Sequence, residues 1–238
     1  MKRKIITSLL LLTLIFSVTA CNSKKKDETD ITPTPIVKTD ALKFKEDYES
    51  LNGKTNKSGK EHRTITIDSD NPFVYTTAEE IVKKVKNKET FYVYFGDTLC
   101  PWCRSAIEMA IKVAKENNIK TIYYVPIWDK DGNEILRDKY VLDDDGNLER
   151  TIEGTDAYYE ILDLFEDVLD DYNLTDSDGN KVSTDEKRIY APNYIYVENG
   201  KAVIKVDGTS ENQKDAREEL TKELLEDEEE IFESLFIR

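Results

Sequence analysis

Two cysteines separated by two residues, Cys100 and Cys103, are the side chains in this sequence best suited to redox chemistry. They stand in Cys100-Pro101-Trp102-Cys103, directly after an aromatic run and ahead of an apolar stripe with helical spacing. Proline is favoured at the first position of a helix. We therefore expect Cys100 to cap a helix whose dipole and free N–H groups stabilise a thiolate. The pattern predicts a redox-active disulfide between Cys100 and Cys103.

The helix pattern assigns different roles to the two thiols. Cys103 begins an apolar stripe, and the opposite side of the helix is polar and carries Arg104, Glu108, Lys112 and Lys115. We expect Cys103 to be buried and Cys100 to be exposed at the helix tip. Cys100 would then attack a substrate disulfide and Cys103 would resolve the mixed disulfide; run backwards, the pair donates a disulfide. A purely structural disulfide is the weaker interpretation, because closing so short a loop contributes little entropy.

A third cysteine, Cys21, follows a segment typical of bacterial export. Residues 1–20 combine a basic start with an apolar run of fourteen residues, 5–18. A transmembrane helix needs about 20 apolar residues, whereas this length suits a signal peptide. Val18-Thr19-Ala20-Cys21 resembles the lipobox of bacterial lipoproteins, in which the cysteine is acylated and becomes the first mature residue. We expect cleavage before Cys21, lipidation of Cys21 and a tether over residues 21–40, rich in Lys, Asp, Thr and Pro.

The remaining chain alternates helix and strand patterns. An N-terminal extension, 41–62, contains one helix, 41–51, and is followed by a domain over 63–238. In that domain the patterns predict strands at 64–67, 90–95, 121–125, 193–197 and 202–206. Helices are predicted at 77–86, 100–117, 155–172 and 210–236. Polar insertions are predicted at about 129–153, where two Asp-Gly-Asn turns favour a hairpin-like structure, and at about 174–188.

This order of elements around Cys-Pro-Trp-Cys resembles the thioredoxin fold. The resemblance implies an α/β three-layer sandwich with a mixed central sheet, two insertions and an N-terminal helical extension. The flanks Phe95-Gly96-Asp97 and Arg104 are also similar to thioredoxin-like lipoproteins and bacteriocin-transport accessory proteins of Gram-positive bacteria.

The resemblance also implies a substrate groove. In the family a cis-proline faces the cysteines, and the matching residue is Pro192, after Ala191. The backbone of Ala191 would pair with an incoming peptide, and Trp102 would offer an apolar contact. The sequence departs from thioredoxins at Tyr94, six residues before Cys100, where the family carries a buried Asp that relays protons.

Charge and ligand patterns exclude several other functions. The net charge of −15 does not suit binding to nucleic acid or anionic lipid head groups. The Asp-rich turns do not align with a 12-residue calcium loop, and the only histidine, His62, lies in a polar stretch. A copper-handling lipoprotein of related fold would need that histidine beside the two cysteines. We expect neither a metal site nor a cofactor.

Together these patterns predict a thiol–disulfide oxidoreductase anchored by lipid to the outer face of the cell membrane. Its expected partners are extracytoplasmic protein thiols and disulfides, and a membrane redox partner. The alternative is a non-enzymatic accessory or docking lipoprotein of the same fold, acting in peptide export or immunity.

Overall fold

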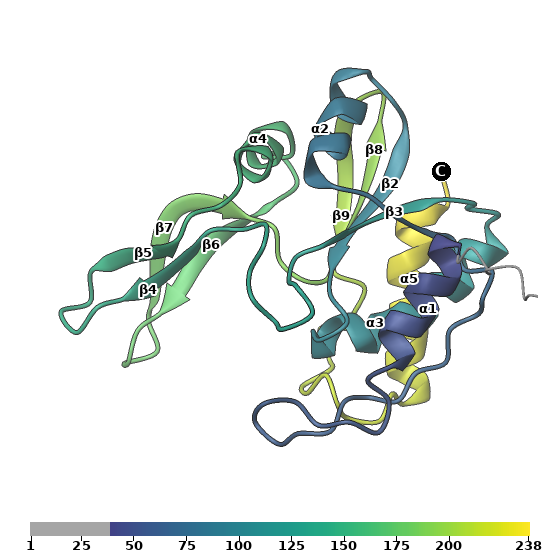
Figure 1. The fold of residues 1–238 in the computed structure, drawn as a ribbon, viewed down its shortest axis with the longest axis horizontal. Coiled ribbons are helices and arrows are strands. Elements are labelled where there is room, and N and C mark those ends of the chain that lie inside the picture. Colours follow the sequence, from purple (N-terminus) through teal and green to yellow (C-terminus); the bar gives the residue numbers. More distant parts are fainter. Residues whose placement is uncertain (1–38) are drawn as a thin grey trace, which may run out of the picture. The chain divides into compact units, whose positions relative to one another are not determined.

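A five-stranded mixed β-sheet forms the centre of residues 39–238, the part of the chain that the computed structural model describes (Figure 1). Its strands lie in the order β1-β3-β2-β8-β9. They span Phe73–Tyr75 (β1), Phe91–Gly96 (β2), Ile122–Pro126 (β3), Asn193–Glu198 (β8) and Lys201–Val206 (β9). β1, β3 and β2 run parallel, β8 is antiparallel to β2, and β9 is antiparallel to β8. The central place of β2 explains its nearly continuous apolar sequence, since both of its faces are covered.

Helices cover both faces of this sheet, so the described chain is a mixed α/β fold. Three helices pack on one face: α1 (Asp40–Glu49), α3 (Pro101–Glu116) and α5 (Lys222–Phe236). Two pack on the other: α2 (Ala78–Lys86) and α4 (Asp156–Leu164). Alternate residues of β2 serve the two sides, because Tyr94 belongs to the first core cluster and Val93 and Phe95 to the second. The helix predicted in the N-terminal extension, α1, contributes the fully buried Phe44 and Tyr48 to the first cluster.

Two β-hairpins lie beside each other and extend away from the five-stranded sheet (Figure 1). One pairs β4 (Lys139–Leu142) with β5 (Leu148–Ile152), and the other pairs β6 (Asp170–Thr175) with β7 (Lys181–Arg188). The two turns have the same hydrogen-bond pattern. In each, the Oδ1 atom of the first Asp, Asp143 or Asp176, accepts the backbone N–H groups of the residues two and four positions later. A buried ion pair of 3.2 Å, Arg188 Nη1 to Asp138 Oδ1, joins the base of the second hairpin to the segment before β4.

Most of the predicted elements are confirmed. The helices expected at 41–51, 77–86 and 100–117 and the strands expected at 90–95 and 121–125 match α1, α2, α3, β2 and β3 within about two residues. The hairpin in the insertion after residue 129 is β4–β5, and the hairpin at 193–206 is β8–β9. In the latter turn Asn199 and Gly200 have φ angles of 50° and 76°, which is the geometry that an Asn-Gly pair favours.

The strand predicted at 64–67 is wrong. This stretch is extended but pairs with no strand, because side chains bind its backbone instead. Asn52 accepts the Ile65 N–H at 3.2 Å and donates to the Ile65 carbonyl at 2.8 Å, and Glu49 accepts the Ile67 N–H at 2.7 Å. The alternation that suggested a strand reflects the burial of Ile65 and Ile67 in the core. The short strand β1 takes the sheet edge, and the sequence patterns did not identify it.

Two predicted helices are too long, and the second polar insertion forms a strand of a hairpin. The helix expected at 155–172 ends at Leu164, and the sequence after it forms β6, paired with β7 in the expected insertion. The Tyr172 ring lies 4.0 Å from the Arg188 guanidinium across this hairpin, so tertiary pairing prevails over helical periodicity. The last helix begins at Lys222, where Thr221 accepts the Leu224 N–H, and residues 210–221 contain no helix.

The predicted export signal, Cys21 and the predicted tether up to residue 38 lie outside the described residues. Within residues 39–238, no helix is both long enough and apolar enough to cross a membrane.

Candidate functional site

The cysteine pair lies where β2 ends and α3 begins. Cys100 is the N-cap of α3, Pro101 occupies the first turn, and the Cys103 N–H donates to Cys100 Sγ at 3.4 Å. On the other side, Cys100 Sγ donates to the Ala191 carbonyl oxygen at 3.3 Å. The peptide bond between Ala191 and Pro192 is cis. The structure therefore brings the predicted groove residues Ala191 and Pro192, from the loop before β8, to the cysteine pair.

The third predicted groove residue, Trp102, is partly buried. It follows Pro101 in the first turn of α3, and its side chain packs against the core cluster that contains both cysteines. Trp102 is therefore next to the reactive helix terminus, with part of its ring open to solvent.

The exposure predicted for Cys100 is wrong. Cys100 is only 4% exposed and Cys103 is fully buried, and both are free thiols. The loop that carries Ala191 covers the Cys100 sulfur, which the helix pattern alone could not indicate. The two thiols therefore differ in their hydrogen bonds rather than in their access to solvent.

Those hydrogen bonds move the two thiol pKa values in opposite directions. The pKa of Cys100 lies below its ordinary value, first because of a hydrogen bond from Cys103 and then because backbone N–H groups of Trp102 and Cys103 point at the sulfur; burial and the charge of Asp97 oppose this. The pKa of Cys103 is raised well above its ordinary value, first by burial and then by Cys100. This asymmetry makes Cys100 the more readily ionised thiol of the pair and Cys103 the thiol that holds its proton more firmly.

Arg104, expected on the polar side of α3, is fully buried. Its guanidinium donates to the Tyr48 carbonyl at 2.8 Å, to Asn52 Oδ1 at 2.8 Å and to the Arg63 carbonyl through Nε at 3.0 Å. Neutral oxygens thus satisfy the buried cation. Arg104 ties the first turn of α3 to α1 and to the segment after it, and so fixes the helix terminus that carries the cysteines.

Tyr94, at the position of the missing acid, is fully buried among aromatic rings near Cys103. Its hydroxyl lies 2.7 Å from the Tyr48 hydroxyl, and its ring stacks on Tyr194 with centroids 4.3 Å apart. Gly96 makes room for this ring, since a Cβ there would lie 2.2 Å from the Tyr94 side chain. Burial holds the pKa of Tyr94 well above its ordinary value, so the hydroxyl keeps its proton and can donate it in a hydrogen bond.

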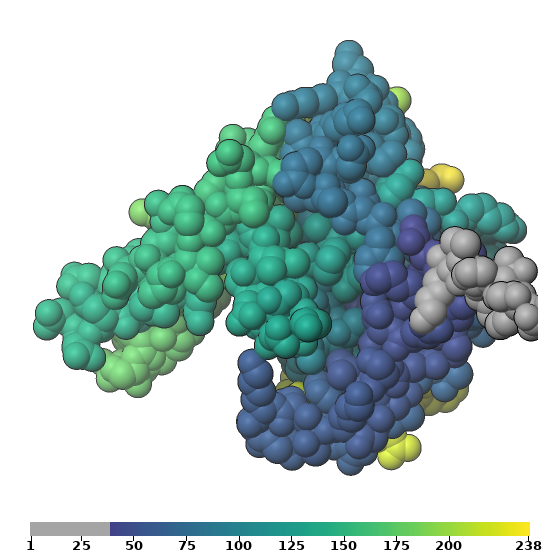
Figure 2. Space-filling view, viewed as in Figure 1, coloured from purple at the N-terminus to yellow at the C-terminus, as the bar shows by residue number. Residues whose placement is uncertain are grey.

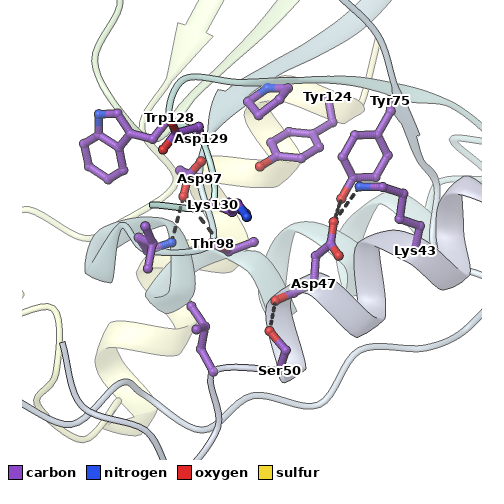
Figure 3. Close-up of a pocket in the computed structure, with 13 residues that line it drawn as sticks. Lys43, Asp47, Ser50, Tyr75, Asp97, Thr98, Tyr124, Trp128, Asp129 and Lys130 are labelled. Carbon is purple, nitrogen blue, oxygen red and sulfur yellow. Dashed lines mark hydrogen bonds and ion pairs between the residues drawn. The ribbon is translucent and has the colours of Figure 1, made fainter. Parts of the chain in front are cut away.

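A carboxylate beside the pair, Asp97, was not identified as a site residue from the sequence. It is 4% exposed and lines a cavity of about 430 Å³ with Tyr75, Tyr124 and Trp128 (Figure 3). Burial raises its pKa to about 6, although N–H groups of Leu99 and Trp128 donate to it. Its place three residues before Cys100, at the end of a buried strand, is the only sequence signal that could have indicated it.

His62 lies apart from this arrangement and lines a second cavity, beyond Leu99. Among residues 39–238, no group of three or more His, Cys, Asp or Glu side chains is placed so that it could hold a metal ion. The described chain thus offers a dithiol, one adjacent carboxyl group and a covering loop.

No protein-family model and no curated protein matches this chain.

Proposed function

We propose that this protein is a thiol–disulfide oxidoreductase of thioredoxin-like fold that acts on protein disulfides through Cys100 and Cys103. The observation that carries the proposal is the geometry of the pair: Cys100 caps α3 directly after the central strand, its sulfur accepts the Cys103 N–H at 3.4 Å, and it contacts the Ala191 carbonyl at 3.3 Å; the opposite directions of the two thiol pKa shifts agree with it. A thiolate at a helix N-terminus next to a protonated resolving thiol is the arrangement that disulfide exchange requires.

The arrangement of elements supports the thioredoxin-like assignment. Apart from the two hairpins, the elements follow one another along the chain as the resemblance implies, with β1 in place of the strand expected at 64–67 and the cysteine helix α3 directly after β2. The loop with Ala191 and Pro192 lies against Cys100, where the resemblance expects the substrate groove. The hairpins β4–β5 and β6–β7 would then be additions between β3 and β8.

In the reducing direction, the Cys100 thiolate attacks one sulfur of a substrate disulfide. The substrate S–S bond breaks, a bond forms between Cys100 and the substrate, and the leaving sulfur takes up a proton. Cys103 then loses its proton and attacks Cys100 Sγ, which releases the second substrate thiol. Two electrons pass to the substrate, and a dithiol of the membrane redox partner would restore the pair; in the oxidising direction every step is reversed.

We place this activity on the outer face of the cell membrane, with extracytoplasmic proteins as substrates. The support is the lipobox-like sequence ending in Cys21 and the polar tether that follows it. Two acyl chains are sufficient for stable anchoring, whereas one is marginal.

Reduction of insulin by dithiothreitol, followed by turbidity, tests the proposal. The wild-type protein should accelerate the reduction at least tenfold over the uncatalysed rate, and the Cys100→Ser variant should not. The assay uses the full chain in detergent. Equal rates for wild type and Cys100→Ser would refute the proposal.

The burial of both sulfur atoms favours one other function, a non-enzymatic docking lipoprotein. In that case the fold would serve as a binding surface for peptide export or immunity, and the dithiol would not turn over. The insulin assay separates the two functions, since only the oxidoreductase accelerates the reaction.

A further inference from the structure

A second cavity, of about 630 Å³, adjoins the residue that precedes Cys100. It lies between the loop after α1 and the turn after β3, two segments that face each other in Figure 2. Its walls include Lys54, Lys57, Lys130, His62, Leu99 and Trp128. Leu99 and Trp128 also line the cavity that contains Asp97, so the two hollows adjoin beside the cysteine helix.

The cavity is basic although the chain carries a net charge of −15. Lys54, Lys57 and Lys130 are exposed, and none of them forms an ion pair with another described residue. Lys57 Nζ instead donates to the backbone oxygen of Asp131 at 2.9 Å. Asp131 is the single acidic residue in the described lining. Three cations thus line this hollow with one carboxylate, whereas the acidic residues Asp47, Asp97 and Asp129 line the adjoining cavity.

His62 adds a buried polar group to the same wall. It is 4% exposed, and its Nδ1 has no hydrogen-bond partner among residues 39–238. Burial, and then the charges of Arg104 and Arg217, lower the pKa of His62, in keeping with positively charged surroundings. A buried ring nitrogen without a partner is costly unless a ligand or water binds it.

The cavity reaches the residue that precedes the attacking cysteine. A Cβ placed on Gly132 would be 3.4 Å from Leu99 Cδ1 and 4.0 Å from Lys57 Nζ, so the three residues meet at one point. Leu99 directly precedes the attacking Cys100. A chain whose disulfide reaches Cys100 could therefore place its neighbouring residues in this hollow.

We propose that this basic pocket binds Asp or Glu side chains next to the disulfide of a polypeptide substrate. The inference rests on the proposed oxidoreductase function and specifies its substrate class. The lysines attract the carboxylates, and Trp128 and Leu99 supply apolar contact beside them. The net negative charge of the molecule repels acidic partners elsewhere on its surface. The basic pocket therefore directs an acidic substrate towards the end of the chain segment that leads to Cys100.

Two synthetic peptides test the pocket. Both contain the same intramolecular disulfide, flanked in one by Asp and Glu and in the other by Asn and Gln. The wild-type protein should reduce the acidic peptide with a kcat/KM roughly tenfold higher at low salt, and this preference should shrink at 0.5 M NaCl, because salt screens the attraction.

The variant Lys54→Gln/Lys57→Gln/Lys130→Gln should lose the preference and keep the rate with the neutral peptide. A matched control, Lys120→Gln/Lys139→Gln/Lys181→Gln, removes the same charge from exposed lysines that also form no ion pair with a described residue. The control should keep the preference. Equal losses in both triple variants would overturn the pocket and indicate a general charge effect.

A binding measurement separates this inference from the proposed function. Calorimetric titration of Cys100→Ser with a cysteine-free acidic peptide should show binding that the pocket variant weakens roughly tenfold. If neither disulfide peptide is reduced, the oxidoreductase fails while this titration still tests the pocket. If both peptides are reduced equally and the titration shows no binding, the pocket fails and the oxidoreductase stands. Pocket-dependent binding to vesicles with anionic lipids, without peptide binding, would also overturn the inference.

Discussion

Cys100 and Cys103 stand one helical turn apart, and their surroundings divide the work between them. Cys100 receives hydrogen bonds at its sulfur, which favour the thiolate. Cys103 is fully buried near Tyr94, Tyr194 and other aromatic rings, which favours the thiol. In disulfide exchange, attack on a substrate disulfide requires a thiolate. The resolving cysteine must remain a thiol until the mixed disulfide has formed.

This difference predicts asymmetric trapping. Cys103→Ala should accumulate mixed disulfides with partner proteins, since the attacking thiolate remains and the resolving thiol is gone. Cys100→Ala should accumulate at least fivefold less, because the remaining thiol is buried and protonated. Non-reducing gel electrophoresis after acid quenching measures both variants. Equal trapping by the two variants would contradict the assigned roles.

A second prediction at this scale concerns Asp97. Its carboxyl group has a pKa raised to about 6 by burial, so it becomes negative as the pH rises through 6. That charge raises the pKa of Cys100. Asp97→Asn removes the charge and keeps an acceptor for the Leu99 N–H, and should therefore lower the Cys100 pKa. Alkylation of Cys100 by iodoacetamide at pH 7 should become roughly twofold faster or more.

The sign of this effect depends on pH. Below pH 6 Asp97 is protonated and uncharged in the wild type, so the variant and the wild type should react at similar rates. The difference should open between pH 6 and 7.5. Asp163→Asn, on the exposed side of α4, is the control and should follow the wild type. A constant ratio across this pH range would exclude the charge of Asp97 as the cause.

The sequence predicts the reactive residues better than their surroundings. Cys100, Cys103 and Ala191 are found together as expected, since a short motif and a proline mark them. Arg104 and Asp97 were not predicted as buried, because a charged residue type normally indicates exposure. The oxygens that bind Arg104, from Tyr48, Asn52 and Arg63, are brought there by tertiary packing, and so is the Trp128 N–H that joins the local Leu99 N–H at Asp97.

At the scale of elements, local signals succeed where one element determines its own ends. Cys100-Pro101 starts α3, and Asn199-Gly200 closes the β8–β9 turn, as the sequence predicts. Signals fail where a distant partner decides the structure. The β6 strand continues a helical pattern, and only its pairing with β7 makes it a strand.

The helix α5 contains a buried residue that its residue type alone does not indicate. Its acidic run includes Glu228, Glu229 and Glu230, which are alike in sequence. Glu228 alone of these is fully buried, in line with Leu224 and Phe232, and neither of its oxygens has a partner among the described residues. Burial raises the pKa of Glu228 to about 8. The carboxyl group therefore remains mostly protonated at neutral pH, in the layer between α5 and α3.

Glu228 predicts a pH-dependent stability. A glutamate in the unfolded chain has a pKa near 4.3, so the folded state holds an extra proton from about pH 4.3 to 8, and stability falls as the pH rises through this window. Glu228→Gln removes the effect. Its gain in the free energy of unfolding should be below about 1 kcal/mol at pH 5 and about 2–4 kcal/mol above pH 8.

Urea unfolding at pH 5, 7 and 8.5 measures this gain. The control is Glu229→Gln, since Glu229 forms a partly exposed ion pair with Lys112 at 2.6 Å. Its removal should change stability by less than about 1 kcal/mol at every pH. Parallel pH profiles of wild type and Glu228→Gln would show that Glu228 is ionised in the folded state.

At the scale of the whole molecule, charged residues are distributed unevenly, and the net charge does not show this. The net charge of −15 predicts repulsion of anionic surfaces, yet Lys54 and Lys57 meet Lys130 across one hollow. These residues are far apart in the sequence, so only the fold brings them together. The same fold lines this hollow with Leu99, the residue before Cys100.

The acidity of the molecule also bears on how it would be held at a membrane. An acidic surface gains nothing from anionic lipid head groups, and no helix among residues 39–238 is suited to cross a bilayer. In the proposed function, the protein is retained by the lipid anchor expected at Cys21.

This reasoning predicts that Cys21→Ser releases nearly all of the protein from the membrane fraction, or leaves it unprocessed with its export signal. Fractionation with immunoblotting measures the release, and intact mass of the mature wild type should show a diacylglyceryl group on Cys21. Cys100→Ser is the matched control, because it removes one thiol from the same chain and should remain with the membrane. A mature wild-type protein of unmodified mass would refute the anchor. It would leave the redox assignment of Cys100 and Cys103 intact, since their geometry does not depend on residue 21.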